Sequence, residues 1–214
     1  MKAAILSLPG LANLAVREVP DPVPGPGEVL VRLRAATLNY RDTLVVEGGY
    51  GSHQRSENLI PLSDGAGEVV SVGDGVDRFV PGDRVVANFF QGWLAGEPDP
   101  EKLSTGLGGK IDGVAAELRV FPQHGLCHTP AHLTDAEAAA LPCAGLTAWS
   151  AVVTHGRVQP GDTVLTQGSG GVSVFALQFA RLAGAEIVAT SSSAEKLERL
   201  RSLGAGHLVN YREV

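Results

Sequence analysis

The sequence predicts an α/β protein in which a mostly antiparallel β domain precedes the first half of a doubly wound parallel sheet, and three observations carry this prediction. Residues 1–125 are rich in Gly, Pro, Val and Asp, and short strand-like runs alternate there with turns. From residue 134 onward, strands and helices alternate at short spacing. A glycine-rich turn at 168–171 follows an apolar strand and opens a helix. We therefore place the two domains at residues 1–133 and 134–214.

The composition excludes several classes of protein. The chain has 214 residues, of which 44% are hydrophobic and 19% charged, as in a soluble globular protein. The net charge of −6 and the lack of a basic run argue against a nucleic-acid partner. No apolar stretch could span a bilayer, and the start is broken by Pro9-Gly10, so it indicates a first strand rather than a signal peptide. Cys127 and Cys143 make no disulfide framework, so we expect a cytoplasmic protein without a membrane partner.

Several segments of the first domain read as strands. "EVLVRLRAA" (28–36) alternates apolar and polar residues, and "GEVVSVGDGV" (67–76) predicts two short strands around a central Gly-Asp-Gly hairpin turn. "PGDRVVAN" (81–88) predicts a turn followed by another strand. Together they indicate a barrel-like or sandwich-like unit. Residues 90–113 show no periodicity and predict a long loop of the functional or mobile kind.

The second domain begins with a helix signal. Thr134 is a predicted N-cap with Glu137 three residues on, and the helix is interrupted at Pro142. The predicted order is then a strand at 162–167, a helix at 171–183, a strand at 186–190, a helix at 193–206 and a strand at 207–211. Since a doubly wound sheet normally has a second half of similar size, we interpret the chain as the N-terminal part of a longer protein rather than a minimal half-domain.

The glycine-rich turn predicts a site for a dinucleotide. Gly168 lets the chain turn tightly, and Gly170 lets backbone N–H groups approach a pyrophosphate at the positive end of the helix. Ser173 stands where a third glycine is usual. A plain glycine-rich connection is the simpler explanation, but the strand–turn–helix–strand context favours a cofactor. The predicted contacts are Gly168, Ser169, Gly170, Gly171 and Val172.

The end of the second strand bears on which cofactor is bound. Enzymes that use NAD(H) place an acidic residue about 20 residues after the turn, where it binds the ribose hydroxyls. Here the chain reads Thr190, Ser191, Ser192 and Ser193, with Lys196 one turn later. Hydroxyls and an ammonium group suit a 2′-phosphate, so we predict NADP(H) in preference to NAD(H), with Ser191, Ser192 and Lys196 as contacts. One of these serines can also simply cap the following helix.

Longer motifs extend this interpretation to the whole chain. They are "PGPGEVLVRLRAATLNYRD", "PLSDGAGEVVSVGDGVDRFVPGDRV", "LPCAGLTAWSAV", "PGDTVLTQGSGGVSVFALQFA" and "LGAGHLVNY". In this order they resemble the medium-chain dehydrogenase/reductase superfamily, in its zinc-independent quinone-oxidoreductase-like branch. The resemblance implies a GroES-like catalytic domain followed by a Rossmann domain, here incomplete at its C-terminus. It also implies a homodimer for the full-length protein.

The resemblance also addresses metal. Zinc-bearing relatives hold their catalytic metal with Cys, His and Cys, and the corresponding positions here are Asn39, Ser63 and Cys143. One thiol cannot hold Zn²⁺ in a three-ligand site, so we predict no metal. The cysteines of a structural zinc lobe are absent from 90–113, and "CHTPAH" (127–132) reads as ordinary loop between a strand and a helix. We interpret Cys143 as a small buried residue near the cofactor rather than a nucleophile.

Four side chains are implied by the resemblance to line the substrate cleft: Asn39, Asp42, Tyr50 and Asp64. Asn39 can donate a hydrogen bond to a carbonyl oxygen, which is the charge-stabilising role that zinc has elsewhere. Tyr50 can donate a hydrogen bond or a proton. Asp42 and Asp64 could equally cap or brace loops.

Other positions complete this comparison with the family. Many quinone-reductase relatives have a tyrosine where this chain has Leu44, which leaves tyrosine-assisted protonation open. Tyr40 is expected to point away from the cleft, on a strand. Thr147 is implied to touch the nicotinamide, and Lys196 and Tyr211 to contact the adenosine 2′-phosphate.

These features predict an NADPH-dependent reductase that passes hydride to a quinone or an α,β-unsaturated carbonyl without metal. Such acceptors need no Lewis acid because delocalisation stabilises the developing charge. Two alternatives stay open. One is an alcohol dehydrogenase-like enzyme, although alcohol oxidation requires a base or metal to remove the hydroxyl proton. The other is a non-catalytic NADPH-binding protein, should these 214 residues be the entire product.

Overall fold

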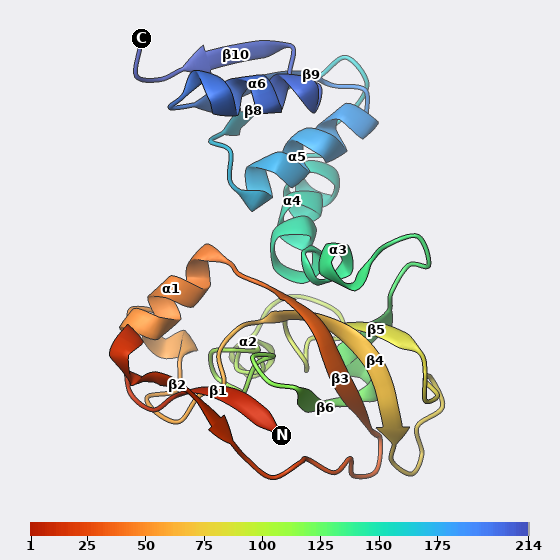
Figure 1. Cartoon of the computed structure of the whole chain (residues 1–214). Helices are drawn as coiled ribbons and strands as arrows, with labels where there is room; N and C mark the ends of the chain where they lie inside the picture. The colour runs from red at the N-terminus through yellow and green to blue at the C-terminus, as the bar shows by residue number, and fades with distance from the viewer. Residues whose placement is uncertain (214) are drawn as a thin grey trace. The chain divides into compact units, whose positions relative to one another are not determined.

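The computed structural model describes residues 1–213, and the chain divides into two compact units, 1–143 and 144–214 (Figure 1). The first unit extends beyond the boundary expected at 133 because helix α3 (Asp135–Ala139) packs on its β-sheet. Ala138 and Ala139 of this helix lie fully buried against Ala66 and Val86 of the sheet.

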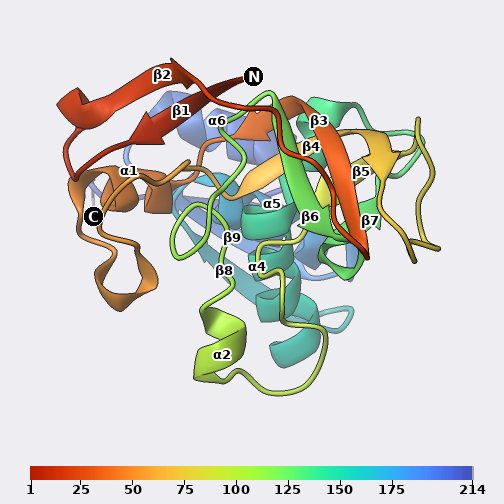
Figure 2. The same cartoon turned by 90° about the horizontal axis from the view of Figure 1, so that it is seen from below.

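The first unit is built on antiparallel strands (Figure 2). A five-stranded sheet has the order β6-β3-β4-β5-β7, and β1 pairs with β2 in a separate two-stranded sheet. The strands are β1 (Lys2–Leu6), β2 (Leu14–Glu18), β3 (Glu28–Thr37), β4 (Asp64–Val72), β5 (Arg84–Ala87), β6 (Leu118–Pro122) and β7 (Leu126–His128). The helices are α1 (Tyr40–Glu47) and α2 (Pro100–Leu103) beside α3, and the single turns are η1 (Leu11–Asn13), η2 (Gly51–His53) and η3 (Gln123–Gly125).

The segment 90–113 is anchored to this sheet. Leu107 is fully buried in the same core as Val29 and Val31 of β3. Its start is held by ring contacts, since the centroids of Phe90 and Trp93 lie 5.5 Å apart. The predicted loop is therefore largely correct, although it contains the short helix α2.

Two predictions for the first unit are wrong. The hairpin expected within 67–76 does not form, because β4 ends at Val72 and its partner β5 begins only at Arg84. The intervening residues turn to bury Phe79 in the core instead of continuing as a strand. The segment after β3 is the helix α1, where the sequence had indicated a strand at Tyr40.

The second unit is a three-stranded parallel sheet of order β10-β9-β8, with crossover helices as predicted. Its elements are β8 (Thr163–Gln167), α5 (Gly171–Leu182), β9 (Glu186–Ser191), α6 (Ala194–Ser202) and β10 (His207–Asn210). Helix α5 packs on β8 and β9, and α6 packs on β9 and β10 (blue in Figure 1). The core includes Leu177, Ile187 and Leu200.

The helix predicted from Thr134 begins as expected. The Thr134 hydroxyl accepts the Glu137 N–H at 3.3 Å, and the Glu137 carboxylate accepts the Thr134 N–H at 2.8 Å. The interruption predicted at Pro142 takes the form of a π-helical segment, as expected where a proline removes a helical hydrogen bond. The elements that follow α3 are η4 (Leu141–Gly145), α4 (Leu146–Trp149) and η5 (Ser150–His155). The indole of Trp149 packs edge-on against Phe179 at 5.3 Å.

Candidate functional site

The first candidate residues lie where β3 ends and α1 begins. Asn39 is the N-cap of α1, and the Asp42 carboxylate accepts the Asn39 backbone N–H at 2.7 Å. This is the reciprocal contact of a capping box, in which a side chain three residues on closes the open first turn. Asp42 therefore has the bracing role that the sequence allowed, and it fixes the backbone of Asn39.

Asp64 is the first residue of β4 and is fully buried, at 0% exposure. The Ser63 hydroxyl donates to Asp64 Oδ1 at 2.5 Å, and the Cys143 backbone N–H donates to Oδ2 at 2.9 Å. Both carboxyl oxygens are therefore used by the protein. Asp64 joins the start of β4 to the last residue of the first unit, which is also a bracing role.

Burial raises the pKa of both Asp42 and Asp64 above the usual aspartate value. Desolvation is the largest cause for each, and hydrogen bonds together with the Arg41 charge offset part of it. The charge of Asp64 also raises the pKa of Asp42, so the two carboxyl groups are electrostatic neighbours. The pair therefore takes up protons at higher pH than exposed aspartates do.

The side-chain amide of Asn39 has an unused donor. Its Nδ2 is buried and no hydrogen bond of good geometry satisfies it, although it lies close enough to Asp64 to lower the pKa of that carboxyl. Buried donors are nearly always paired, so an unpaired one at a candidate site is notable. An oxygen atom of a ligand would satisfy it.

Tyr50 joins this group through Arg41. The Arg41 guanidinium lies 4.7 Å from the centroid of the Tyr50 ring, and its Nη1 lies 3.3 Å from Asp42 Oδ1. The ring packs on a small core formed by Leu6, Val45 and Leu59. The structure thus brings Asn39, Asp42, Tyr50 and Asp64 into one region of the first unit.

The neighbouring Tyr40 does point away from the others, but for a different reason than expected. It is the first residue of α1 rather than part of a strand, and its side chain is 81% exposed. Leu44 lies on the same helix and is half-buried.

The glycine turn of the second unit connects β8 to α5. Gly168 has a φ of 84°, which favours glycine, and its N–H donates to the Thr190 carbonyl at 3.1 Å and to the Thr190 hydroxyl at 3.2 Å. The Ser173 hydroxyl donates to the Gln167 carbonyl at 2.7 Å. A serine is thereby accommodated at the position of the third glycine. Ser169 is half-buried, and Val172 is exposed on the first turn of α5.

Gly170 is the N-cap of α5, and no side chain caps this helix end. Its φ of −78° suits any residue, and a Cβ built there would meet nothing within 4 Å. The protein itself therefore gives no reason for glycine here. Gly171 differs, because its Cβ would approach the Ala144 side chain at 3.4 Å. The open space beside unpaired helix N–H groups fits the pyrophosphate of a dinucleotide.

The serines after β9 have different surroundings. Ser191 is only 2% exposed, and its carbonyl accepts the Tyr211 N–H at 3.2 Å. Ser192 is half-buried, and Ser193 caps α6 by accepting the Lys196 N–H at 3.4 Å, which confirms the capping role expected for one of them. The side chains of Lys196 and Tyr211 are exposed, so Ser192, Lys196 and Tyr211 are the accessible members of the predicted set.

Thr147, predicted to touch the nicotinamide, lies on α4 in the second unit, with an exposed side chain. It stands between two π-helical segments, η4 and η5. Such segments occur often at functional sites.

The two cysteines have different surroundings. Burial, with the Asp64 charge beside it, raises the pKa of Cys143 to about 11. Cys127 and His128 lie on β7, not in a loop, and Cys127 is exposed. Within residues 1–213, no three His, Cys, Asp or Glu side chains are grouped as a metal site would need.

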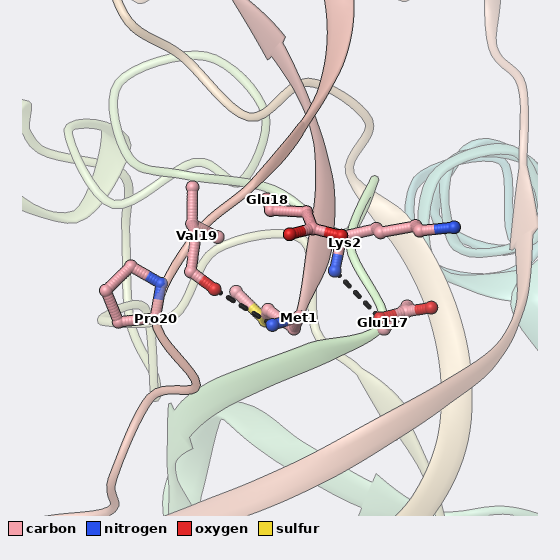
Figure 3. A pocket seen from close by; sticks show the side chains of 6 residues that line it. All are labelled: Met1, Lys2, Glu18, Val19, Pro20 and Glu117. Atoms are coloured by element: carbon pink, nitrogen blue, oxygen red, sulfur yellow. Dashed lines mark hydrogen bonds between the residues drawn. The ribbon is translucent and has the colours of Figure 1, made fainter.

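A hollow of about 490 Å³ lies elsewhere on the first unit (Figure 3). Figure 3 shows the Met1 amino group donating to the Val19 carbonyl, at 2.8 Å, and the Lys2 N–H donating to Glu117, at 2.7 Å. The first contact holds the chain start beside the residue that follows β2, and the second ties β1 to the residue that precedes β6. None of the candidate residues lines this hollow.

Arg41 and Ser63 contact the candidate residues directly, a role that was not predicted for either of them. Arg41 stands inside "NYRD", and a charged residue beside two predicted site residues was the signal that could have drawn attention to it. Nothing in the sequence marks the hydrogen bond from Ser63 to Asp64. No helix within residues 1–213 has the length and apolarity that crossing a membrane requires.

Known families and proteins resemble this chain over most of its length. The family described as alcohol dehydrogenase GroES-like domain matches residues 25–131, and the one described as zinc-binding dehydrogenase matches residues 171–214. A zinc-type alcohol dehydrogenase-like protein of Schizosaccharomyces pombe is 47% identical over 198 residues, covering 92% of this chain and 57% of its own length. A chloroplastic quinone oxidoreductase of Triphysaria versicolor is 36% identical over 210 residues, covering 95% and 58%.

Solved structures agree with these matches. The crystal structure of a putative alcohol dehydrogenase from Sinorhizobium meliloti superposes with a TM-score of 0.92 at 43% identity. It covers 100% of this chain and 63% of its own. The chain thus spans about three fifths of the length of the proteins it matches. The predicted combination of an antiparallel β domain and a partial parallel sheet is confirmed.

Proposed function

The chain belongs to the alcohol dehydrogenase GroES-like family within the medium-chain dehydrogenase/reductase superfamily, and from this premise we propose that the protein is an NADPH-dependent oxidoreductase. Its proposed acceptor is a quinone or an α,β-unsaturated carbonyl, reduced without metal. The observation that carries the proposal is the buried, unpaired Nδ2 of Asn39. A fixed donor of this kind suits an oxygen on which negative charge develops.

The proposed steps use few residues. NADPH, once bound, would supply a hydride from its nicotinamide to an electron-poor carbon and leave as NADP⁺, with negative charge developing on the conjugated oxygen. The Asn39 amide donates a hydrogen bond to that oxygen and stabilises its charge. Tyr50 then gives its phenolic proton to the enolate or quinolate and takes one back from water. Asp42 and Asp64 act as positioning residues, through the Asn39 backbone and the start of β4.

The proposed cofactor contacts lie in the second unit. The N-terminal amides of α5 and the open space at Gly170 support pyrophosphate binding. The neutral hydroxyl of Ser192 and the positive ammonium group of Lys196 are both accessible, which supports binding of a 2′-phosphate. Tyr211, which is 54% exposed, completes the proposed contacts together with Ser191, which is buried. Thr147 is the proposed contact of the nicotinamide.

The donor set does not suit zinc. At the positions that resemble zinc ligands, Asn39 offers an amide and the Ser63 hydroxyl is committed to Asp64. Cys143 offers one thiol, and one thiol is too few for a three-ligand zinc site. Zinc prefers thiolate, imidazole and carboxylate ligands. We therefore propose hydride transfer without metal.

The test uses the purified intact protein. Calorimetry with NADPH and NADH comes first, followed by kinetics with a quinone, an enone, and an alcohol plus oxidised cofactor. We expect tighter NADPH binding and turnover with the quinone or enone. Preferred oxidation of the alcohol, the activity suggested by the name of the Schizosaccharomyces pombe relative, would overturn the proposed substrate class. Cofactor binding without any turnover would favour a non-catalytic protein.

Replacing the amide isolates the role of Asn39. We expect Asn39→Leu to lower kcat/KM for the acceptor by roughly a hundredfold, because the oxyanion loses its donor. NADPH affinity should not change. The matched control is Asn13→Leu, which removes an amide that donates only to the Pro9 carbonyl, at 2.8 Å. An equal fall in both variants would contradict the assignment.

A further inference from the structure

Arg41 is a buried charge that the proposed chemistry does not use. It is 8% exposed, and among the residues that the structure describes it is the only buried cation. Its Nε is buried without a hydrogen-bond partner. Burying a guanidinium is expensive, and a well-packed apolar side chain often gives equal or greater stability. Simple stabilisation is therefore a weak reason for an arginine here.

The contacts of Arg41 come from four separate segments. Nη1 lies 3.3 Å from Asp42 Oδ1, and Nη2 donates to the Gly108 carbonyl at 3.3 Å. The guanidinium carbon lies 4.7 Å from the Tyr50 ring centroid and 4.9 Å from that of Phe89. Both aromatic contacts are within cation–π range. One planar cation thus joins its own helix α1 to Tyr50 just before η2, to Phe89 just after β5, and to the segment 105–113.

The backbone is shaped around this cation. A Cβ at Gly109 would lie 2.9 Å from Arg41 Nη2 and 2.6 Å from the His53 carbonyl oxygen, so only glycine permits this approach. Gly108 has a φ of 62°, which also favours glycine. The run "GLGG" at 106–109 therefore lets the chain pass close to the guanidinium.

We propose that Arg41 is a positioning residue for the reduction, which fixes the Tyr50 ring relative to the Asn39–Asp42 turn. This inference rests on the proposed function. Arg41 acts through Tyr50 and Asp42 and does not touch the acceptor. Without it, the phenol and the Asn39 amide are held by independent segments, and small displacements of reacting groups reduce rates steeply.

The chain offers a matched control in Arg119 on β6. Its Nε is also buried and unpaired, its Nη2 donates to the Asp112 carbonyl at 3.0 Å, and its guanidinium lies 5.8 Å from the Phe121 ring. Arg119→Met therefore removes a less buried cation of the same unit, whose Nε is likewise unpaired, without touching Tyr50 or Asp42. Loss of stability alone should affect both variants alike.

The experiment compares Arg41→Met, Arg41→Lys, Phe89→Leu and Arg119→Met in the intact protein. Measured quantities are kcat and KM for a quinone, the NADPH Kd, the urea midpoint, and amide hydrogen exchange at 50–54 and 105–113. We expect Arg41→Met to lower kcat about tenfold to a hundredfold with the NADPH Kd unchanged, and to speed exchange in both segments. Arg41→Lys should recover part of kcat, and Arg119→Met should keep it.

The outcomes separate the two proposals. If kcat in Arg41→Met stays within twofold of wild type, or falls equally in Arg119→Met, the positioning role is wrong. If the wild-type protein reduces no quinone or enone, the proposed function is wrong. Hydrogen exchange then tests whether Arg41 holds Tyr50 in place: faster exchange only in the Arg41 variants supports this, and unchanged exchange contradicts it. Should Arg41→Met not fold, Arg41→Lys and Phe89→Leu decide it, and unchanged kcat and exchange in both would overturn it.

Discussion

The surroundings of the two cysteines give them different chemistry. Cys143 is half-buried beside Asp64, and its pKa is raised to about 11, whereas Cys127 is exposed on β7. Only the thiolate reacts with alkylating agents. At about pH 8 the Cys143 side chain is therefore mostly in the thiol form, and its ionised fraction grows as the pH rises toward the pKa.

We therefore expect iodoacetamide at about pH 8 to label Cys127 well before Cys143 in the folded protein. Peptide mass spectrometry over time measures both rates. In Cys127→Ser the native protein should react very slowly, and in Cys143→Ser the fast reaction should remain. Equal rates at the two sites in native protein would show that Cys143 is more reactive than its burial implies.

At this scale the sequence predicted some roles and missed others. The family resemblance led to Asn39, Asp42, Tyr50 and Asp64, and the structure groups these four. Arg41 was missed, because its acceptor at Gly108 lies 67 residues away in the sequence. A guanidinium held by such distant partners leaves no local pattern. The catalytic and cofactor roles themselves stay predictions.

Helix α1 shows how a short element escapes sequence patterns. It has eight residues, and Val45 is its only buried aliphatic side chain, so no apolar stripe marks it. The β-branched Thr43 and Val46 also favour strands. Its start was nevertheless signalled, since Asn39 followed by Asp42 is an N-cap pattern. Helices α5 and α6 were predicted because each has more than one buried apolar side chain on one face.

The glycine turn before α5 provides a test at the scale of an element. We expect Gly170→Ala to leave the urea midpoint nearly unchanged, because its φ suits alanine and the space is open. NADPH binding should weaken by tenfold or more, since the added Cβ would stand beside the amides proposed to bind the pyrophosphate. Calorimetry measures the affinity.

The control for this variant lies in the same unit. A Cβ at Gly206 would make only an ordinary contact, 3.9 Å from the Ile187 carbonyl oxygen. Gly206→Ala should therefore change neither affinity nor stability appreciably. If Gly170→Ala binds NADPH as tightly as wild type, the turn is a plain connection and not a phosphate site.

For the whole molecule, each unit has its own hydrophobic core. The division into an antiparallel and a parallel unit followed from composition and periodicity, which extend over many residues and survive local errors. The boundary shifted because α3 buries its alanines against the first sheet, a contact that only tertiary structure reveals. The homodimer and the cytoplasmic location stay predictions.

Metal content is a property of the whole preparation. We expect the intact protein to contain well under one zinc per chain, and a chelator to leave turnover within about twofold, because the residues at the family's ligand positions suit zinc poorly. Elemental analysis and assays before and after chelation measure this. Stoichiometric zinc together with lost turnover would favour the alcohol dehydrogenase alternative.

The chain has two tryptophans, and they fall one in each unit. Trp93 ends a series of ring contacts that leads through Phe90 and Phe89 to Arg41. Trp149, which stands two positions after Thr147, packs on Phe179. Single Trp→Phe variants therefore make each unit separately visible by its emission. Fluorescence quenching and energy transfer to reduced nicotinamide can then time the arrival of dinucleotide and acceptor in one stopped-flow trace, with no added label.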